Sequence, residues 1–124
     1  LKPMARLVGY NFAGVEPKYM GIGPVPAVRK LLADAELSIG DIDVWEVNEA
    51  FAAQALAVCR DLELPLEKVN VNGSGISLGH PIGATGAIIT VKALHELQRS
   101  DGRYAVVTMC IGGGQGIAAL FERV

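Results

Sequence analysis

VNVNGSGISLGHPIGATGAIITVKALHELQ, the run from Val69 to Gln98, decides the fold class of this chain. Its first residues, 69–71, are strand formers, and residues 72–81 form a glycine-rich loop. Apolar residues then recur at helical spacing, namely Ala84, Ala87, Ile88, Val91 and Leu94. A strand, a loop and a helix in this order indicate an α/β protein.

Strands and helices alternate on both sides of this run. Strands are predicted over 6–13, 44–47, 104–109 and 116–121, and helices over 25–35 and 50–62. Residues 14–26 are loop-like, and CIGGGQ at 110–115 joins the last two strands. The order predicts one layered α-β-α domain over residues 1–124, with a mixed, mostly parallel five-stranded sheet that ends in a hairpin.

Composition narrows the class of function. A chain of 124 residues can bury a core of its own, and its apolar runs are far shorter than the roughly 20 residues that span a bilayer. The net charge of −2 provides no basic surface for nucleic acid or anionic lipid. Hydrophobic residues make up 51% of the chain, which indicates either a face covered by another domain or strands buried on both faces.

Two cysteines form neither a disulfide framework nor a zinc signature, which favours a reducing compartment. Metal binding through Cys59, His80, His95 and Cys110 fits no recognised ligand spacing. Cys59 lies among alanine and valine in a predicted helix and is interpreted as a buried small hydrophobe. The chain begins at Leu1 without an initiator methionine or a signal-peptide pattern, so we expect it to be a piece of a longer protein.

Three polar residues follow predicted strands: Asn48, His80 and Cys110. Ligands of open α/β sheets bind outside the carboxyl ends of the strands, so these side chains are expected to converge. A cysteine with a histidine supports nucleophilic or acid–base catalysis, although a histidine in a glycine-rich loop is also often purely structural. The glycines after Cys110 place backbone N–H groups where they can face a developing negative oxygen.

Other residues are predicted to be structural. Trp45 and Phe51 are interpreted as packing residues, and Lys92 as a charge that solvates its helix face. The glycine clusters alone mark turns, and neither matches a phosphate-binding loop, because the lysine of that motif is missing.

Four blocks together resemble the C-terminal domain of thiolases: MGIGPVPA at 20–27, VNEAF at 47–51, NGSGISLGHPIGATG at 72–86 and CIGGGQG at 110–116. The resemblance covers nearly the whole chain. Similar GHP-containing stretches occur in β-ketoacyl synthases and in sterol-carrier thiolase-like proteins. Cys110 favours a true thiolase, because those families usually lack this final cysteine.

The resemblance implies a role for each matching residue. His80 would activate a nucleophilic cysteine and help to hold the thioester oxygen, and Cys110 would move the proton on the α-carbon of acetyl-CoA. Asn48 would position a water of the first oxyanion hole, and the backbone N–H of Gly112 would contribute to the second. Met20 and Phe51 would line the acyl and pantetheine path.

The same resemblance implies acyl transfer with a coenzyme A thioester as substrate and no tightly bound cofactor. The family's nucleophilic cysteine belongs to an N-terminal domain that is not found in these residues, so the isolated chain is expected to be inactive. Expected partners are that N-terminal domain and further copies in a homo-oligomer. A non-catalytic docking or binding module is the alternative. The expected location is the cytoplasm, with mitochondria and peroxisomes left open.

Overall fold

The computed structural model describes residues 1–124, which form a four-stranded sheet flanked by helices. The strands are β1 (Ala5–Gly14), β2 (Val44–Val47), β3 (Tyr104–Ile111) and β4 (Gln115–Arg123), in the order β1-β4-β3-β2. The helices are α1 (Pro24–Asp34), α2 (Ala52–Asp61), the single turn α3 (Gly75–Leu78) and α4 (Thr85–Ser100). Three 3₁₀ turns, η1 (Pro17–Ile22), η2 (Ile39–Asp41) and η3 (Leu66–Lys68), complete the chain.

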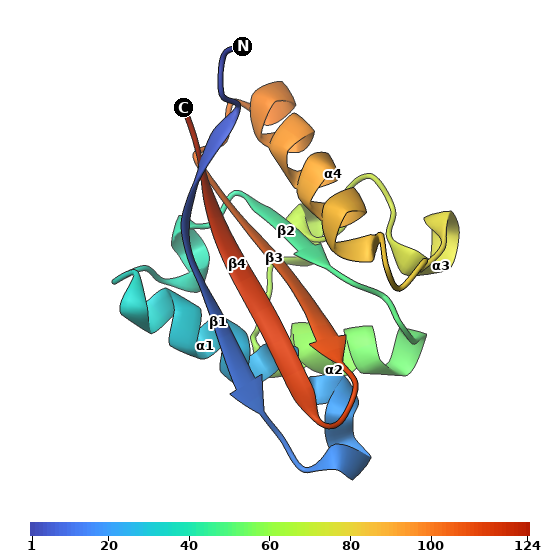
Figure 1. Cartoon of the computed structure of the whole chain (residues 1–124). Coiled ribbons are helices and arrows are strands. Elements are labelled where there is room, and N and C mark those ends of the chain that lie inside the picture. The colour runs from blue at the N-terminus through green and yellow to red at the C-terminus, as the bar shows by residue number, and fades with distance from the viewer.

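Helices cover both faces of the sheet, which confirms the layered α/β arrangement (Figure 1). Successive strand residues point to opposite faces, so Trp45 and Val106 pack against α1 and α2 whereas Val44 and Ala105 pack against α4. None of the helices combines the length with the apolar composition that crossing a bilayer requires.

The predicted five-stranded, mostly parallel sheet is wrong in both strand number and direction. The sheet has four strands, and only the β2–β3 pair is parallel. β4 returns from β3 through a tight turn and therefore runs antiparallel to it, and β1 pairs antiparallel with the other side of β4. Local sequence pattern contains no signal for that β1–β4 pairing, because the two strands lie at opposite ends of the chain.

The strand predicted over 69–71 is reduced to a single bridge between Val69 and Trp45. Asn70 interrupts it with a left-handed backbone, φ 51°. The Asn70 side chain instead bonds the edge of β2: Val47 N donates to its Oδ1 and its Nδ2 donates to Val47 O, each at 2.8 Å. A side-chain amide thus takes the place of a fifth strand.

Smaller differences concern the loops. The segment predicted as loop over 14–26 contains η1 and the first turn of α1, and the glycine-rich loop over 72–81 contains α3. The predicted helices over 25–35, 50–62 and 84–98 correspond to α1, α2 and α4 with shifts of at most two residues at their ends. Cys110 lies inside β3 rather than after it, because the strand extends to Ile111.

Two glycines let η1 approach the β3–β4 hairpin. A Cβ atom on Gly23 or on Gly116 would overlap the backbone of the other segment. Only glycine allows this approach, and it holds Met20, on η1, beside the end of β3.

Candidate active site

A cavity of about 370 Å³ opens where the carboxyl ends of β2 and β3 meet the loop before α4. Its wall is formed by Met20, Ala50, Phe51, His80, Ile82, Met109, Cys110, Ile111 and Gly112. Five of the six site residues predicted from the sequence line this cavity. The sixth, Asn48, does not line it but contacts the side chain of His80.

Parallel pairing explains why Asn48 and Cys110 share one edge of the sheet. The backbone N–H of Asn48 donates to Thr108 O at 2.9 Å, so the chain leaves β2 alongside the last residues of β3. Cys110 lies opposite Gly116 in the β3–β4 ladder, and the backbone of Gly23 packs closely against that glycine.

Asn48 is 1% exposed, and its side chain faces the imidazole of His80. Asn48 Nδ2 lies 3.5 Å from both Nδ1 and Nε2 of His80. The Oδ1 atom of Asn48 is buried and has no hydrogen-bond partner among the protein atoms. A buried amide oxygen without a partner is costly, so it is suited to binding a water or a polar ligand atom.

His80 follows α3 and Gly79, whose φ of 98° turns the chain back toward the sheet. Its Nδ1 atom lies 2.6 Å from Oγ1 of Thr85, the first residue of α4. His80 also lines the cavity, where a reacting group has access to it.

Cys110 is half-buried, and burial raises the pKa of its thiol above the ordinary value. The thiol is therefore protonated at neutral pH and can act as a proton donor. The turn that follows contains Gly113 and Gly114, with φ of 79° and 83°, and a Cβ on Gly112 would meet only open space. The backbone of Gly112 is thus accessible from the cavity.

Sequence and structure comparisons agree on one family. The family described as "Thiolase, C-terminal domain" matches residues 1–123. This chain belongs to the thiolase C-terminal domain family. The predicted resemblance is confirmed.

Close relatives of this thiolase C-terminal domain include a beta-ketothiolase of Cupriavidus necator, 72% identical over 124 residues. The mitochondrial 3-ketoacyl-CoA thiolase of Homo sapiens is 56% identical over 120 residues, or 97% of the chain. The chain spans about a third of the length of these relatives, 32% and 30% respectively.

Solved structures agree. The acetyl-CoA acetyltransferase of Bacillus anthracis superimposes over 100% of the chain and 32% of its own length, with a TM-score of 0.98 and 56% identity. Human mitochondrial 3-ketoacyl-CoA thiolase, solved in complex with CoA, superimposes with a TM-score of 0.97 and 54% identity. The match covers 99% of the chain and 31% of the length of the human protein.

The thiolase C-terminal domain also contains buried charges near the site that the sequence interpretation missed. Glu46 is fully buried on β2, and its Oε2 accepts a hydrogen bond from Lys92 Nζ of α4 at 2.8 Å. Burial raises the pKa of the Glu46 carboxyl, and Lys92 opposes that shift. The expectation that Lys92 solvates its helix face is wrong, because its ammonium also donates to the carbonyl of Gly73. The available signal was a charged residue inside the apolar strand VWEV.

Further polar contacts hold the loop that leads to His80. Glu49 accepts hydrogen bonds from Asn70 Nδ2 at 3.3 Å and from the backbone N–H of Ile76 at 3.1 Å. Ser74 Oγ donates to Val47 O at 3.3 Å, and Asn72 Nδ2 donates to Glu96 of α4 at 2.8 Å. The loop is therefore tied to both β2 and α4 before the chain reaches the cavity.

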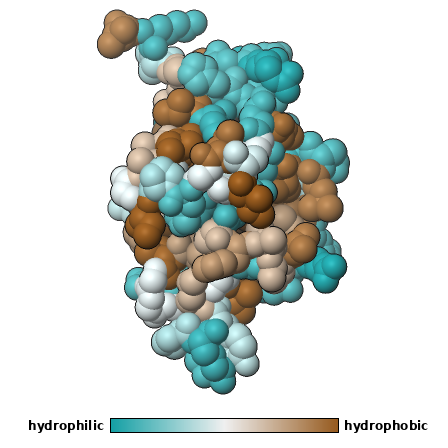
Figure 2. All heavy atoms as spheres, turned by 90° about the vertical axis from the view of Figure 1, so that its right-hand side faces the viewer, coloured by the Kyte–Doolittle hydropathy of each residue, from teal (hydrophilic) through white to brown (hydrophobic).

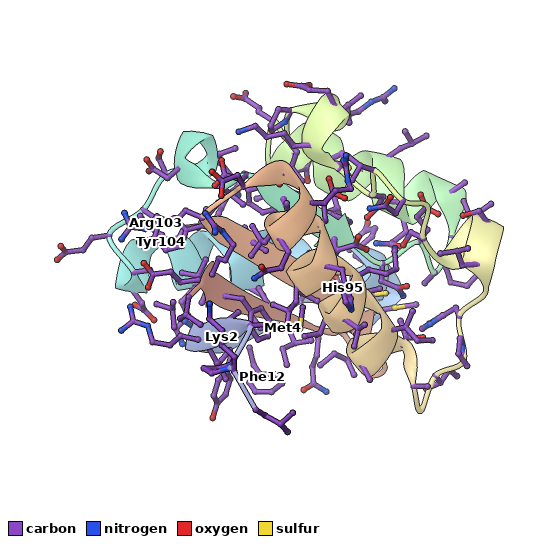
Figure 3. The ribbon with its side chains drawn as sticks, turned by 90° about the horizontal axis from the view of Figure 1, so that it is seen from above. Lys2, Met4, Phe12, His95, Arg103 and Tyr104 are labelled. Carbon is purple, nitrogen blue, oxygen red and sulfur yellow. The ribbon has the colours of Figure 1, made fainter.

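The remaining candidates lie away from the cavity. Cys59 is buried in α2, and burial raises the pKa of its thiol as well. His95 lies on α4 and is exposed (Figure 3). No group of three or more histidine, cysteine, aspartate or glutamate side chains is arranged to hold a metal ion.

Proposed function

We propose that this chain supplies the acid–base half of a thiolase that cleaves 3-ketoacyl-CoA with CoA or, in reverse, condenses acetyl-CoA. One observation carries the proposal: His80 and Cys110 line the same cavity although they come from different elements. Asn48 lies directly behind His80. A second wall, with the nucleophilic cysteine, would come from the part of the relatives' length that this chain does not span.

In the degradative direction, His80 takes the proton of the nucleophilic cysteine, whose sulfur attacks the keto carbon of 3-ketoacyl-CoA. The carbon–carbon bond breaks, and its electron pair passes to the α-carbon of the departing acetyl-CoA. Cys110 donates its thiol proton to that carbon. CoA then gives its own thiol proton to Cys110 and attacks the acyl group, and the released cysteine recovers its proton from His80.

The environment of Cys110 suits a group that donates a proton in thiolysis and removes one in condensation. Burial raises the pKa of its thiol, so the group carries a proton at neutral pH when the carbanion needs one. The same burial makes the resulting thiolate a stronger base toward the thiol of CoA. In the condensation direction that basicity serves to remove a proton from acetyl-CoA.

Two groups are assigned to developing negative oxygens. Asn48, with its buried amide, would hold a water beside His80 at the first oxyanion site. The backbone N–H of Gly112 would donate at the second, where no side chain obstructs the approach. Met20 and Phe51 would line the acyl and pantetheine path, since both border the cavity and Phe51 is 61% exposed.

The partner is proposed from the face on which α3 and α4 lie. Figure 2 views this side and shows apolar side chains gathered across its middle. The large exposed apolar residues of α3, α4 and the loop between them are Ile76, Leu78, Ile82, Ile88 and Val91. Such a surface indicates a covering protein layer, and we assign it to the N-terminal half of a thiolase, within a homo-oligomer. The substrate would be a CoA thioester, with no tightly bound cofactor.

The predicted cytoplasmic location stays a prediction. Relatives carry names that place them in mitochondria or in the cytosol. The two free thiols of this chain fit any reducing compartment.

The test uses the longer polypeptide that contains this chain, assayed for thiolysis of acetoacetyl-CoA. His80→Ala and Cys110→Ala are each expected to lower kcat by about 10² to 10⁴, the usual contribution of a positioned acid or base. His95→Ala and Cys59→Ala are the matched controls, since the same residue types lie outside the cavity. A near-wild-type rate in either cavity variant would remove that residue from the mechanism.

A non-catalytic docking module is the second candidate, favoured by the fact that Cys110 is the only thiol on the cavity wall. The purified 124-residue chain is expected to show no thiolysis by itself. Gel filtration with a separately produced N-terminal half then separates the two functions. A complex that restores turnover supports the thiolase, whereas a complex without turnover supports docking alone.

A further inference from the structure

Thr85 has a buried hydroxyl that contacts His80 and does not line the cavity. The residue is 2% exposed and begins α4. Its Oγ1 donates a hydrogen bond to the carbonyl of Pro81 at 3.0 Å, and its backbone N–H donates to the same carbonyl at 2.9 Å. Oγ1 also lies 2.6 Å from Nδ1 of His80.

Counting protons decides the direction of the contact with His80. A threonine hydroxyl has a single proton, and at Oγ1 of Thr85 that proton can point to Pro81 O at 3.0 Å, a carbonyl that also accepts the backbone N–H groups of Ala84 and Thr85. With the proton in that position, Oγ1 is an acceptor toward His80, and Nδ1 of His80 carries the proton that the two atoms share at 2.6 Å. In the opposite arrangement the hydroxyl proton would point to Nδ1, leaving two oxygen acceptors facing each other at 3.0 Å without a proton between them.

No other contact selects between the two ring nitrogens. Asn48 Nδ2 is equally far from both, at 3.5 Å, so it favours neither tautomer. The Thr85 hydroxyl is therefore the one group that distinguishes Nδ1 from Nε2.

We propose that Thr85 is a positioning residue that fixes the tautomer of His80, with the proton on Nδ1 and the lone pair on Nε2. In the neutral and in the protonated ring Nδ1 keeps its proton, so Nε2 is the atom that gains and loses one. Pro81 completes the chain, because its carbonyl fixes the hydroxyl. The catalytic consequence rests on the proposed thiolase function, whereas the tautomer itself does not.

The direct test is nitrogen NMR of the 124-residue chain labelled with ¹⁵N-histidine. The chain has two histidines, so His95→Gln and His80→Gln assign the signals. At a pH where the ring is neutral, His80 is expected to show a protonated Nδ1 and an unprotonated Nε2. Exposed His95 is expected to show mainly the Nε2–H form that free histidine prefers.

Three threonine variants sharpen the measurement. Thr85→Val removes the hydroxyl at nearly constant volume and is expected to move His80 toward the Nε2–H form. Thr85→Ser keeps the hydroxyl and should preserve the wild-type tautomer. Thr90→Val makes the same change elsewhere on α4 and should leave His80 unchanged. A wild-type His80 with its proton on Nε2, or a Thr85→Val spectrum unchanged from wild type, would overturn the proposal.

Kinetics of the longer polypeptide test the consequence. Thr85→Val is expected to lower kcat for acetoacetyl-CoA thiolysis roughly 10-fold to 100-fold, with little change in KM, because the wrong tautomer is a poor base. Thr85→Ser should restore most of the rate. A wild-type kcat for Thr85→Val contradicts the positioning role. If the tautomer is as proposed while His80→Ala stays active, the proposed function fails and the tautomer assignment stands.

Discussion

The two faces of the sheet differ in how they are covered. Toward α1 and α2, a cluster of 15 buried apolar residues fills the space, with Trp45 fully buried in it. Toward α4, the apolar cluster has six residues, and buried polar groups such as Glu46, Thr85 and Glu96 lie beside it.

The difference separates stability from function. The apolar side supplies most of the hydrophobic stabilisation, although the Trp45 indole N–H is buried there without a hydrogen-bond partner. The α4 side uses hydrogen bonds and a buried ion pair, which are costly when incomplete but fix side-chain positions. The cavity lies where the carboxyl ends of β2 and β3 meet the loop before α4. His80 in that loop contacts Thr85 of α4, so the face of the sheet with buried polar groups is the one that orients His80.

The largest expected loss of stability comes from a substitution on the apolar side of the sheet. Trp45→Ala removes a fully buried side chain and is expected to lower the free energy of unfolding by about 3 to 5 kcal/mol. Phe51→Ala, at an aromatic residue that is 61% exposed, should change it by about 0.5 kcal/mol or less. Urea denaturation followed by circular dichroism measures both variants. Fluorescence is unsuitable, because Trp45→Ala removes the only tryptophan of the chain. Equal costs for the two variants would contradict the comparison.

The next effect concerns the ion pair on the α4 side. Lys92→Met leaves the Glu46 carboxylate buried without a partner and is expected to cost about 3 kcal/mol at neutral pH. Lys30→Met, at an exposed lysine of α1, is the matched control.

The stability cost of Lys92→Met is expected to rise with pH, because it depends on the charge of Glu46. Because burial raises the pKa of Glu46 in the folded state, the folded protein binds more protons there than the unfolded chain does. Its stability contribution is complete below the ordinary value of 4.5 and is lost as pH rises through the folded pKa. Removing Lys92 removes the group that opposes the shift, so the loss should extend to higher pH. A Lys92→Met penalty that is the same at pH 5 and pH 8 would rule out Glu46 as its source.

The smallest effect compares two glycines. Gly116→Ala forces a methyl group into the backbone of Gly23 and is expected to cost about 1 to 3 kcal/mol. Gly86→Ala meets only Met109 Cε at 3.5 Å, an ordinary contact, and should stabilise α4 by up to about 1 kcal/mol. Thermal unfolding of both variants measures the difference, and a stabilised Gly116→Ala would show that the close approach at η1 is not required.

Local rules about strand ends placed Asn48, His80 and Cys110 together, whereas Met20, Phe51 and Gly112 were predicted only from the resemblance to thiolases. Asn48 directly follows a strand whose ends are clear from VWEV, and Cys110 precedes glycines that mark the hairpin turn. Strands that pair in parallel bring such residues to one edge without any knowledge of the remaining sheet.

The parts that sequence reasoning missed depend on contacts between distant residues. Asn70 looks like a polar residue inside a short strand, and only its bonds to Val47 show that it replaces one. Lys92 looks solvated because its partner, Glu46, is 46 residues away. The role of Thr85 depends on the angle at which His80 returns to the sheet, which no local pattern specifies.

Asn70 also affects the behaviour of the sheet in a crowded solution. β2 is the outermost strand, and an uncovered strand edge can recruit strands of other molecules and begin aggregation. The Asn70 amide occupies the N–H and the carbonyl of Val47, and its backbone N–H occupies the carbonyl of Trp45. A single asparagine therefore closes this edge to intermolecular pairing and leaves β1, at the far side of the sheet, as the border where unwanted association would start.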